Sequence, residues 1–147
     1  VVSEMGEGKF LNQVVAGAHR FLMDEPPSVG GYDAGPNPYD LLAAALGGCT
    51  SMTMRMYADR KGIPLERVEV EVGHATTHCD DCEATVSGST PKVDEWTRVL
   101  HIEGDLTEDQ RAGLVRIADR CPVHLTLERS SKVVTEVADA DGGDPED

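Results

Sequence analysis

Cys121 stands in a setting that favours thiol chemistry. Pro122 follows it directly, and proline is favoured at the first position of a helix, so the sequence predicts that Cys121 caps a short helix. The unpaired N–H groups at such a helix start favour the thiolate form of a cysteine. Arg120 and His124 add positive or polarising neighbours. Cys121 is therefore a candidate reactive thiol, although the same motif also fits an ordinary corner between two helices.

Cys49 lies inside a long predicted helix, directly after Gly47 and Gly48. A glycine inside a helix costs about 1 kcal/mol relative to alanine. Close approach of another backbone or of a substrate would explain two such residues in a row. Cys49 is then either a second reactive thiol or a small buried residue that packs against a neighbouring element, and the helix alone leaves both readings open.

Cys79 and Cys82 form a second pair, with His74 and His78 close by. Two thiolates and two imidazoles are ligands that Zn²⁺ accepts. The spacing is not that of a standard zinc finger, however, and Asp80–Asp81 place negative charge where a thiolate would form. We expect a polar loop without a bound metal, and a zinc-stabilised structural protein stays open as an alternative.

The helix around Cys49 is the clearest element in the sequence. Asn37 is a good N-cap, Pro38 suits the first helical position, and Asp40 falls near the positive end of the helix. Gly62 supplies the C-terminal stop. These signals predict a helix over 38–61, and its apolar side chains extend beyond a single stripe, so we expect it to be buried on more than one side.

The other elements alternate between strands and helices. Thr107 predicts the start of a second helix that ends near Cys121, because Pro122 cannot continue it. The remaining predictions are a hairpin from 9–16 and 19–23, strands over 68–72 and 96–102, and a closing strand over 131–137. This order predicts an α+β fold.

Composition limits the possible functions. The 147 residues fit one domain, which we place at 1–138, followed by an acidic flexible tail over 139–147. A net charge of −14 repels phosphate groups, so we expect no nucleic-acid partner and no binding to anionic membranes. The first residues lack the features of a secretion signal, and four cysteines without one predict a reducing, cytoplasmic location.

Two long segments, Pro38–Thr53 and Ala118–His124, resemble the cysteine motifs of the OsmC family. Shorter segments that also fit are Met56–Gly62, Gly104–Thr107 and, for one subgroup, Asp24–Pro26, Gly30–Gly31 and Gly35–Pro36. The resemblance covers about residues 9–137. It implies an OsmC-like fold, with antiparallel sheets around a long central helix. It also implies an intertwined homodimer in which the two cysteines pair at the subunit interface.

The resemblance further implies thiol-dependent reduction of peroxides, most typically organic hydroperoxides, in defence against oxidative or osmotic stress. By this analogy Cys49 attacks the O–O bond as a thiolate and becomes a sulfenic acid, and Cys121 resolves it to a disulfide. An external dithiol then restores both thiols. No metal or organic cofactor is expected.

One position departs from the family pattern. The peroxidase branches carry a Glu directly after the helix-opening proline, paired with an Arg from the N-terminal part, whereas this chain has Tyr39 there. Asp40 and Arg20 are the residues that we expect to replace this pair. The alternative function is a non-catalytic OsmC-like stress module that holds a hydrophobic ligand at the dimer interface, with Cys49 merely buried.

Overall fold

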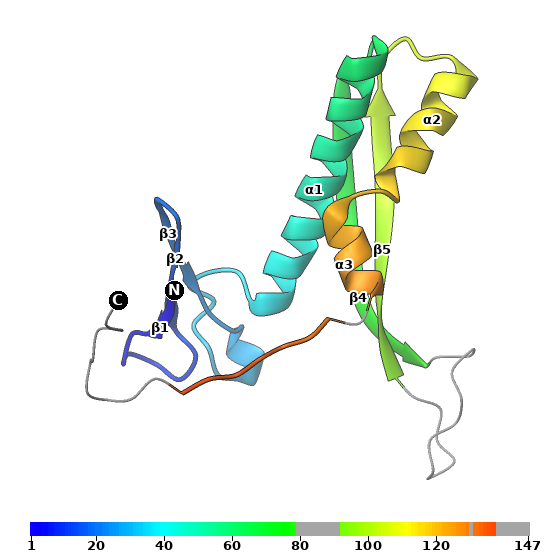
Figure 1. The fold of residues 1–147 in the computed structure, drawn as a ribbon. Helices are drawn as coiled ribbons and strands as arrows, with labels where there is room; N and C mark the ends of the chain where they lie inside the picture. The colour runs from blue at the N-terminus through cyan, green and yellow to red at the C-terminus, as the bar shows by residue number, and fades with distance from the viewer. Residues whose placement is uncertain (79–91, 130, 138–147) are drawn as a thin grey trace, which may run out of the picture.

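The computed structural model describes residues 1–78, 92–129 and 131–137, which form two groups of elements (Figure 1). An N-terminal antiparallel sheet has the order β1-β2-β3, and the second group holds one long helix, a two-stranded sheet and two shorter helices. The bounds are β1 Val2–Glu4, β2 Asn12–Ala16, β3 His19–Met23, α1 Pro38–Lys61, β4 Arg67–His78, β5 Lys92–Glu103, α2 Glu108–Ala118 and α3 Pro122–Glu128. The α+β prediction is confirmed.

Helix α1 has the bounds that its end signals predict. The Asn37 side chain accepts a hydrogen bond from the Asp40 N–H at 3.0 Å, and the Asp40 carboxylate accepts one from the Asn37 N–H at 3.0 Å. This reciprocal capping box satisfies N–H groups that a helix start leaves unpaired. At the other end Gly62 adopts the left-handed conformation, with φ 64°, and closes the helix. Thr107 and Gln110 form the same kind of box at the start of α2.

The core lies where α1 packs on β4 and α2 packs on α1. Its fully buried cluster comprises Met54, Ala58, Leu65, Leu114 and Ala118. The opposite side of α1 is open in the single chain, where Met52 and Met56 are 68% and 73% exposed. Burial of α1 on more than one side therefore stays a prediction for the assembled protein.

The predicted closing strand is wrong for the single chain. Residues 131–137 form no strand and are exposed throughout, since no described strand of the same chain lies alongside to pair with them. The sequence analysis also missed β1, which pairs antiparallel with β2, Val2 lying opposite Val14. The predicted acidic tail over 139–147 lies outside the described residues. Among the helices that the structure describes, none has the length and apolarity needed to cross a membrane.

The loop between β3 and α1 is organised by one buried carboxylate. Asp24 is 2% exposed and accepts hydrogen bonds from the N–H groups of Glu25 and Tyr32, at 2.9 and 2.8 Å, and of Ala34. Burial opposes the charge, but these backbone donors together hold the pKa of Asp24 below its ordinary value. The loop is also tight at Gly31, where a Cβ would stand 1.8 Å from the Glu25 carbonyl oxygen.

We expect Asp24→Asn to lower the stability of the protein at pH 7, because the amide loses the charge that the three donors stabilise. A carboxyl whose pKa is depressed by folding contributes stability above its unfolded pKa, and loses it as the pH falls through the folded pKa. The difference in denaturation midpoint between wild type and Asp24→Asn should therefore be constant near neutral pH and shrink below about pH 4. Asp33→Asn, an exposed position in the same loop, is the control; equal midpoints for Asp24→Asn and wild type at pH 7 would contradict the role of Asp24.

Candidate active site

The structure brings Cys49 and Cys121 together. Helix α3 packs against α1, and the two side chains hydrogen bond to one another although they stand on different helices. Both are free thiols in this structure. Cys121 is the N-cap of α3, as predicted, and is completely buried, whereas Cys49 is only partly buried. A solute reaching this pair from solvent therefore meets Cys49 first.

The two thiols differ in acidity. Burial raises the pKa of Cys49, and its hydrogen bond to the Cys121 sulfur raises it further. Burial also opposes a thiolate at Cys121, but the donors around that sulfur outweigh it and lower the pKa of Cys121. The largest of these contributions comes from the Cys49 thiol, followed by the His124 N–H and the Thr50 hydroxyl. When the pair loses one proton, Cys121 is therefore the thiolate and Cys49 keeps its proton.

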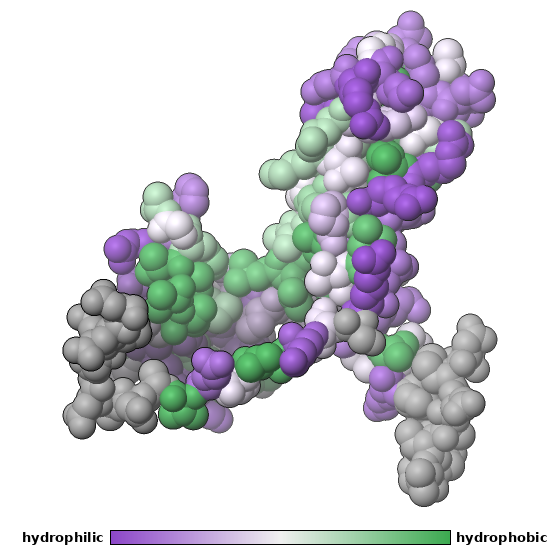
Figure 2. Space-filling model, viewed as in Figure 1, coloured by the Kyte–Doolittle hydropathy of each residue, from purple (hydrophilic) through white to green (hydrophobic). Residues whose placement is uncertain are grey.

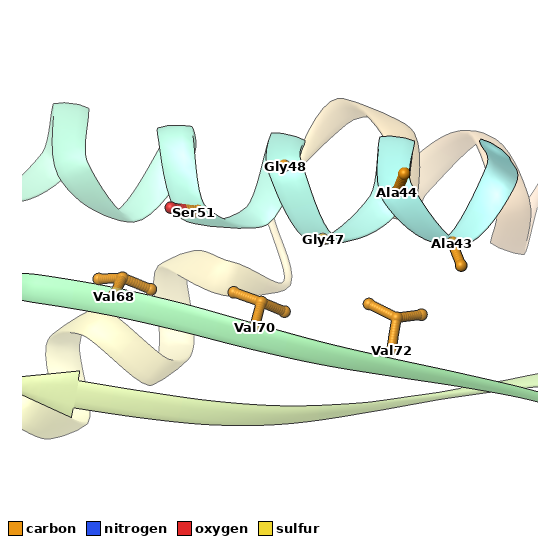
Figure 3. A pocket seen from close by; sticks show the side chains of 8 residues that line it. All are labelled: Ala43, Ala44, Gly47, Gly48, Ser51, Val68, Val70 and Val72. Atoms are coloured by element: carbon orange, nitrogen blue, oxygen red, sulfur yellow. The ribbon is translucent and has the colours of Figure 1, made fainter. Parts of the chain in front are cut away.

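We expected Gly47 and Gly48 to let the long helix approach the corner at Pro122, and this expectation is wrong. A Cβ at Gly47 would stand 3.2 Å from Cγ2 of Val72 and 3.6 Å from the carbonyl oxygen of Val70, so this glycine lets α1 approach β4, not the corner at Pro122 (Figure 3). No described residue comes within 4 Å of the place where a Cβ of Gly48 would stand. The contact between α1 and the Cys121 corner thus needs neither glycine.

Asp40 and Arg20 do not join the thiol pair within one chain. Asp40 belongs to the capping box at the start of α1, more than two helical turns before Cys49. Arg20 lies exposed on β3, in the N-terminal sheet, which stands apart from α3 (Figure 1). Tyr39, in the place of the family's Glu, stacks on His74 with ring centroids 4.5 Å apart. A catalytic role for Asp40 or Arg20 stays a prediction that needs a second subunit.

Arg98 on β5 is a site residue that the sequence analysis missed. Its guanidinium donates to the Thr50 hydroxyl oxygen at 3.1 Å and to the Ala118 carbonyl oxygen at 3.0 Å, next to the buried thiol. The strand pattern contained a signal for this role, because Arg98 lies on the same, inward face of the strand as Trp96 and Leu100. A charged residue in that register must find partners inside the protein.

A cavity of about 330 Å³ opens between α1 and the corner of α2 and α3, and its lining includes Thr53, one helical turn after Cys49, and Pro122, which follows Cys121. Thr53, whose hydroxyl donates to the Cys49 carbonyl oxygen at 2.8 Å, lines one end. The surface of the cavity is mostly apolar, and its other lining residues are Met56, Tyr57, Arg60, Ile117, Arg120 and Pro122. This cavity can hold an apolar group beside Thr53, one helical turn from Cys49.

The second cysteine pair, Cys79 and Cys82, lies outside the described residues. Of the two histidines considered as its metal partners, His74 is engaged elsewhere: its ring packs against both Tyr39 and Trp96, and Nε2 lies 2.9 Å from the Asp94 carboxylate. Across the described ranges no group of three or more His, Cys, Asp or Glu side chains is arranged to hold a metal ion.

Comparison with known proteins agrees with the geometry. Residues 31–136 match the family described as OsmC-like protein, and the chain belongs to this family. No curated protein matches it by sequence.

Solved structures share the fold at low sequence identity. An organic hydroperoxide resistance protein OsmC from Legionella pneumophila is 20% identical, with a TM-score of 0.61 and coverage of 86% of each chain. One from Elizabethkingia anophelis, with thiocyanate bound, is 19% identical, with a TM-score of 0.62 over 86% of this chain and 84% of that one. An OsmC-like protein from Mycoplasma pneumoniae is 18% identical, with a TM-score of 0.60 over 80% and 79%. These likenesses establish the OsmC fold.

Proposed function

We propose that this protein is a thiol-dependent hydroperoxide reductase that uses Cys49 and Cys121. The observation that carries the proposal is the hydrogen-bonded thiol pair, in which the partly buried Cys49 is the less acidic thiol and the fully buried Cys121 the more acidic one. Membership of the OsmC-like family supports it, and two structural neighbours are named organic hydroperoxide resistance proteins. Such a pair can pass through a disulfide and return, given an external dithiol.

The reaction starts from a pair that holds one proton. Cys49 reaches the peroxide because it is the more exposed thiol, and its proton passes to the Cys121 thiolate across the hydrogen bond that joins them. The Cys49 thiolate attacks the terminal oxygen of ROOH; the S–O bond forms, the O–O bond breaks, and RO⁻ leaves and takes a proton from water. Cys121 then attacks the sulfenic sulfur, so that a disulfide forms and water leaves. An external dithiol reduces this disulfide, as fits a reducing compartment such as the cytoplasm.

The surroundings of Cys49 favour an organic hydroperoxide over hydrogen peroxide. The cavity beside Thr53 is largely apolar in surface, and an alkyl or aryl group placed there is removed from water. Hydrogen peroxide has no such group. The test compares the turnover of cumene hydroperoxide with that of hydrogen peroxide under an excess of a dithiol. We expect a higher kcat/KM for cumene hydroperoxide. Absence of dithiol-dependent turnover with either peroxide would sink the enzymatic proposal and favour the non-catalytic, ligand-binding alternative.

We also propose that the protein is a homodimer. Four exposed apolar residues flank Cys49 on the open side of α1 at helical spacing: Leu42, Ala45, Met52 and Met56. Figure 2 shows hydrophobic residues gathered over the N-terminal sheet and the first turns of α1. An unpartnered apolar surface of this kind marks an interface, and an obligate dimer buries roughly 2,000 Å² or more.

Light scattering should give the mass of two chains at micromolar concentration. Met52→Glu places a charge among these apolar residues and should shift the mass towards one chain, because the buried carboxylate would have no partner. Val115→Glu, at an exposed apolar position on α2, is the matched control and should stay dimeric. A single-chain mass for the wild type would show that the dimer is wrong.

A further inference from the structure

The Arg98 side chain contacts four acceptor groups beside the thiol pair. The side chain is 14% exposed, and it donates to the Thr50 hydroxyl at 3.1 Å, the Ala118 carbonyl at 3.0 Å and the Asp119 carboxylate at 2.8 Å. A fourth contact joins it to Nδ1 of His124 at 3.2 Å. Because a guanidinium can only donate, every one of these four atoms must act as the acceptor.

The acceptors lie on both sides of Cys121 in the chain. Ala118 and Asp119 precede the cysteine, at the end of α2, and His124 follows it, in the first turn of α3. The contact with Arg98 requires an unprotonated Nδ1, so the His124 ring presents its Nε2–H to Glu128, 3.1 Å away. One side chain from β5 therefore ties together the two halves of the corner that places Cys121 against Cys49.

Thr50 connects Arg98 to the sulfur itself. Its side chain is completely buried, and its hydroxyl oxygen accepts from Arg98. The hydroxyl hydrogen is then left for the Cys121 sulfur, with which Thr50 also hydrogen bonds. Because hydrogen bonds in a chain polarise one another, a charged donor behind Thr50 strengthens the bond from Thr50 to the thiolate.

We propose that Arg98 is the positioning residue of the thiol pair: through Thr50 it directs a hydroxyl hydrogen onto the Cys121 sulfur, and through Ala118, Asp119 and His124 it fixes the corner that holds this cysteine. Arg98 touches neither the sulfur nor the substrate, so its action is indirect. Its relevance to peroxide reduction rests on the proposed function, whereas the network itself can be tested without any peroxide.

The test is the ultraviolet absorbance of the thiolate, followed against pH in reduced, full-length protein with Cys79 and Cys82 replaced by serine. Thr50→Val removes the hydroxyl and leaves the other contacts of Arg98 in place. We expect a midpoint at higher pH and, at a fixed pH below it, about tenfold less thiolate, since a hydrogen bond to a charged group of ordinary strength changes ionisation by about this factor. Thr50→Ser keeps the hydroxyl and should restore the wild-type curve.

Arg98→Met should move the midpoint in the same direction as Thr50→Val. Arg55→Met is the matched control, because Arg55 also bridges elements, donating to the backbone carbonyls of Leu65 and Glu66, but lies outside the thiol network. It should lower stability without moving the midpoint. If Arg98→Met does not fold, the test rests on the titration midpoints of Thr50→Val and Thr50→Ser. Folded Thr50→Val with a wild-type titration overturns the proposal, even if the protein reduces hydroperoxides; a shifted titration supports it, even if no peroxide is turned over.

Discussion

Replacing Cys49 with serine is expected to abolish hydroperoxide turnover. The hydroxyl of serine is a far weaker nucleophile than a thiolate, and Cys121, which keeps its sulfur, is completely buried. Loss of an attacking nucleophile costs roughly a thousandfold or more in kcat. The measurement is dithiol-dependent consumption of cumene hydroperoxide, and Cys82→Ser, which we predict to be dispensable, is the control that should keep wild-type activity.

The Cys49→Ser variant also shows which of the two cysteines is the attacking nucleophile. Cys121 has the lower pKa of the two thiols, and acidity alone would make it the attacking residue, whereas exposure selects Cys49. If Cys49→Ser still consumes one equivalent of hydroperoxide and forms a sulfenic acid on Cys121, the assigned order of the two cysteines is wrong.

Replacing Cys121 with serine should leave the first step and block the second. The variant should consume one equivalent of hydroperoxide and stop at a sulfenic acid on Cys49, because no neighbouring thiol can attack it. A dimedone-type reagent should trap this species, and mass spectrometry should locate the added mass on the peptide of Cys49. Continued turnover by Cys121→Ser would exclude a resolving role for Cys121.

Local chemistry made parts of the fold predictable from the sequence. The bounds of α1 follow from Asn37, Asp40 and Gly62, whose side chains or backbone satisfy groups that the helix ends leave unpaired, whatever the rest of the chain does. Cys121 at the start of α3 follows in the same way from Pro122. The meeting of Cys49 with Cys121 is a tertiary contact, and it was expected only through the resemblance to the OsmC family.

Other features depend on contacts between distant segments and were missed for that reason. Gly47 packs on Val70 and Val72 of β4, a neighbour that the sequence of the helix does not specify. The segment 131–137 has the composition of a strand, but no strand among the described residues pairs with it. Arg98 stands 23 positions before the cysteine that it supports, and only its inward place in the strand pattern signalled a structural role.

The most direct test of the thiol-pair mechanism is the product of one equivalent of cumene hydroperoxide with the reduced protein. Peptide mapping under non-reducing conditions should then show Cys49 linked to Cys121, with two thiols lost per equivalent and both recovered on adding a dithiol. A bond between Cys79 and Cys82 instead, or oxidation of Cys49 with no linked peptide, would contradict the mechanism.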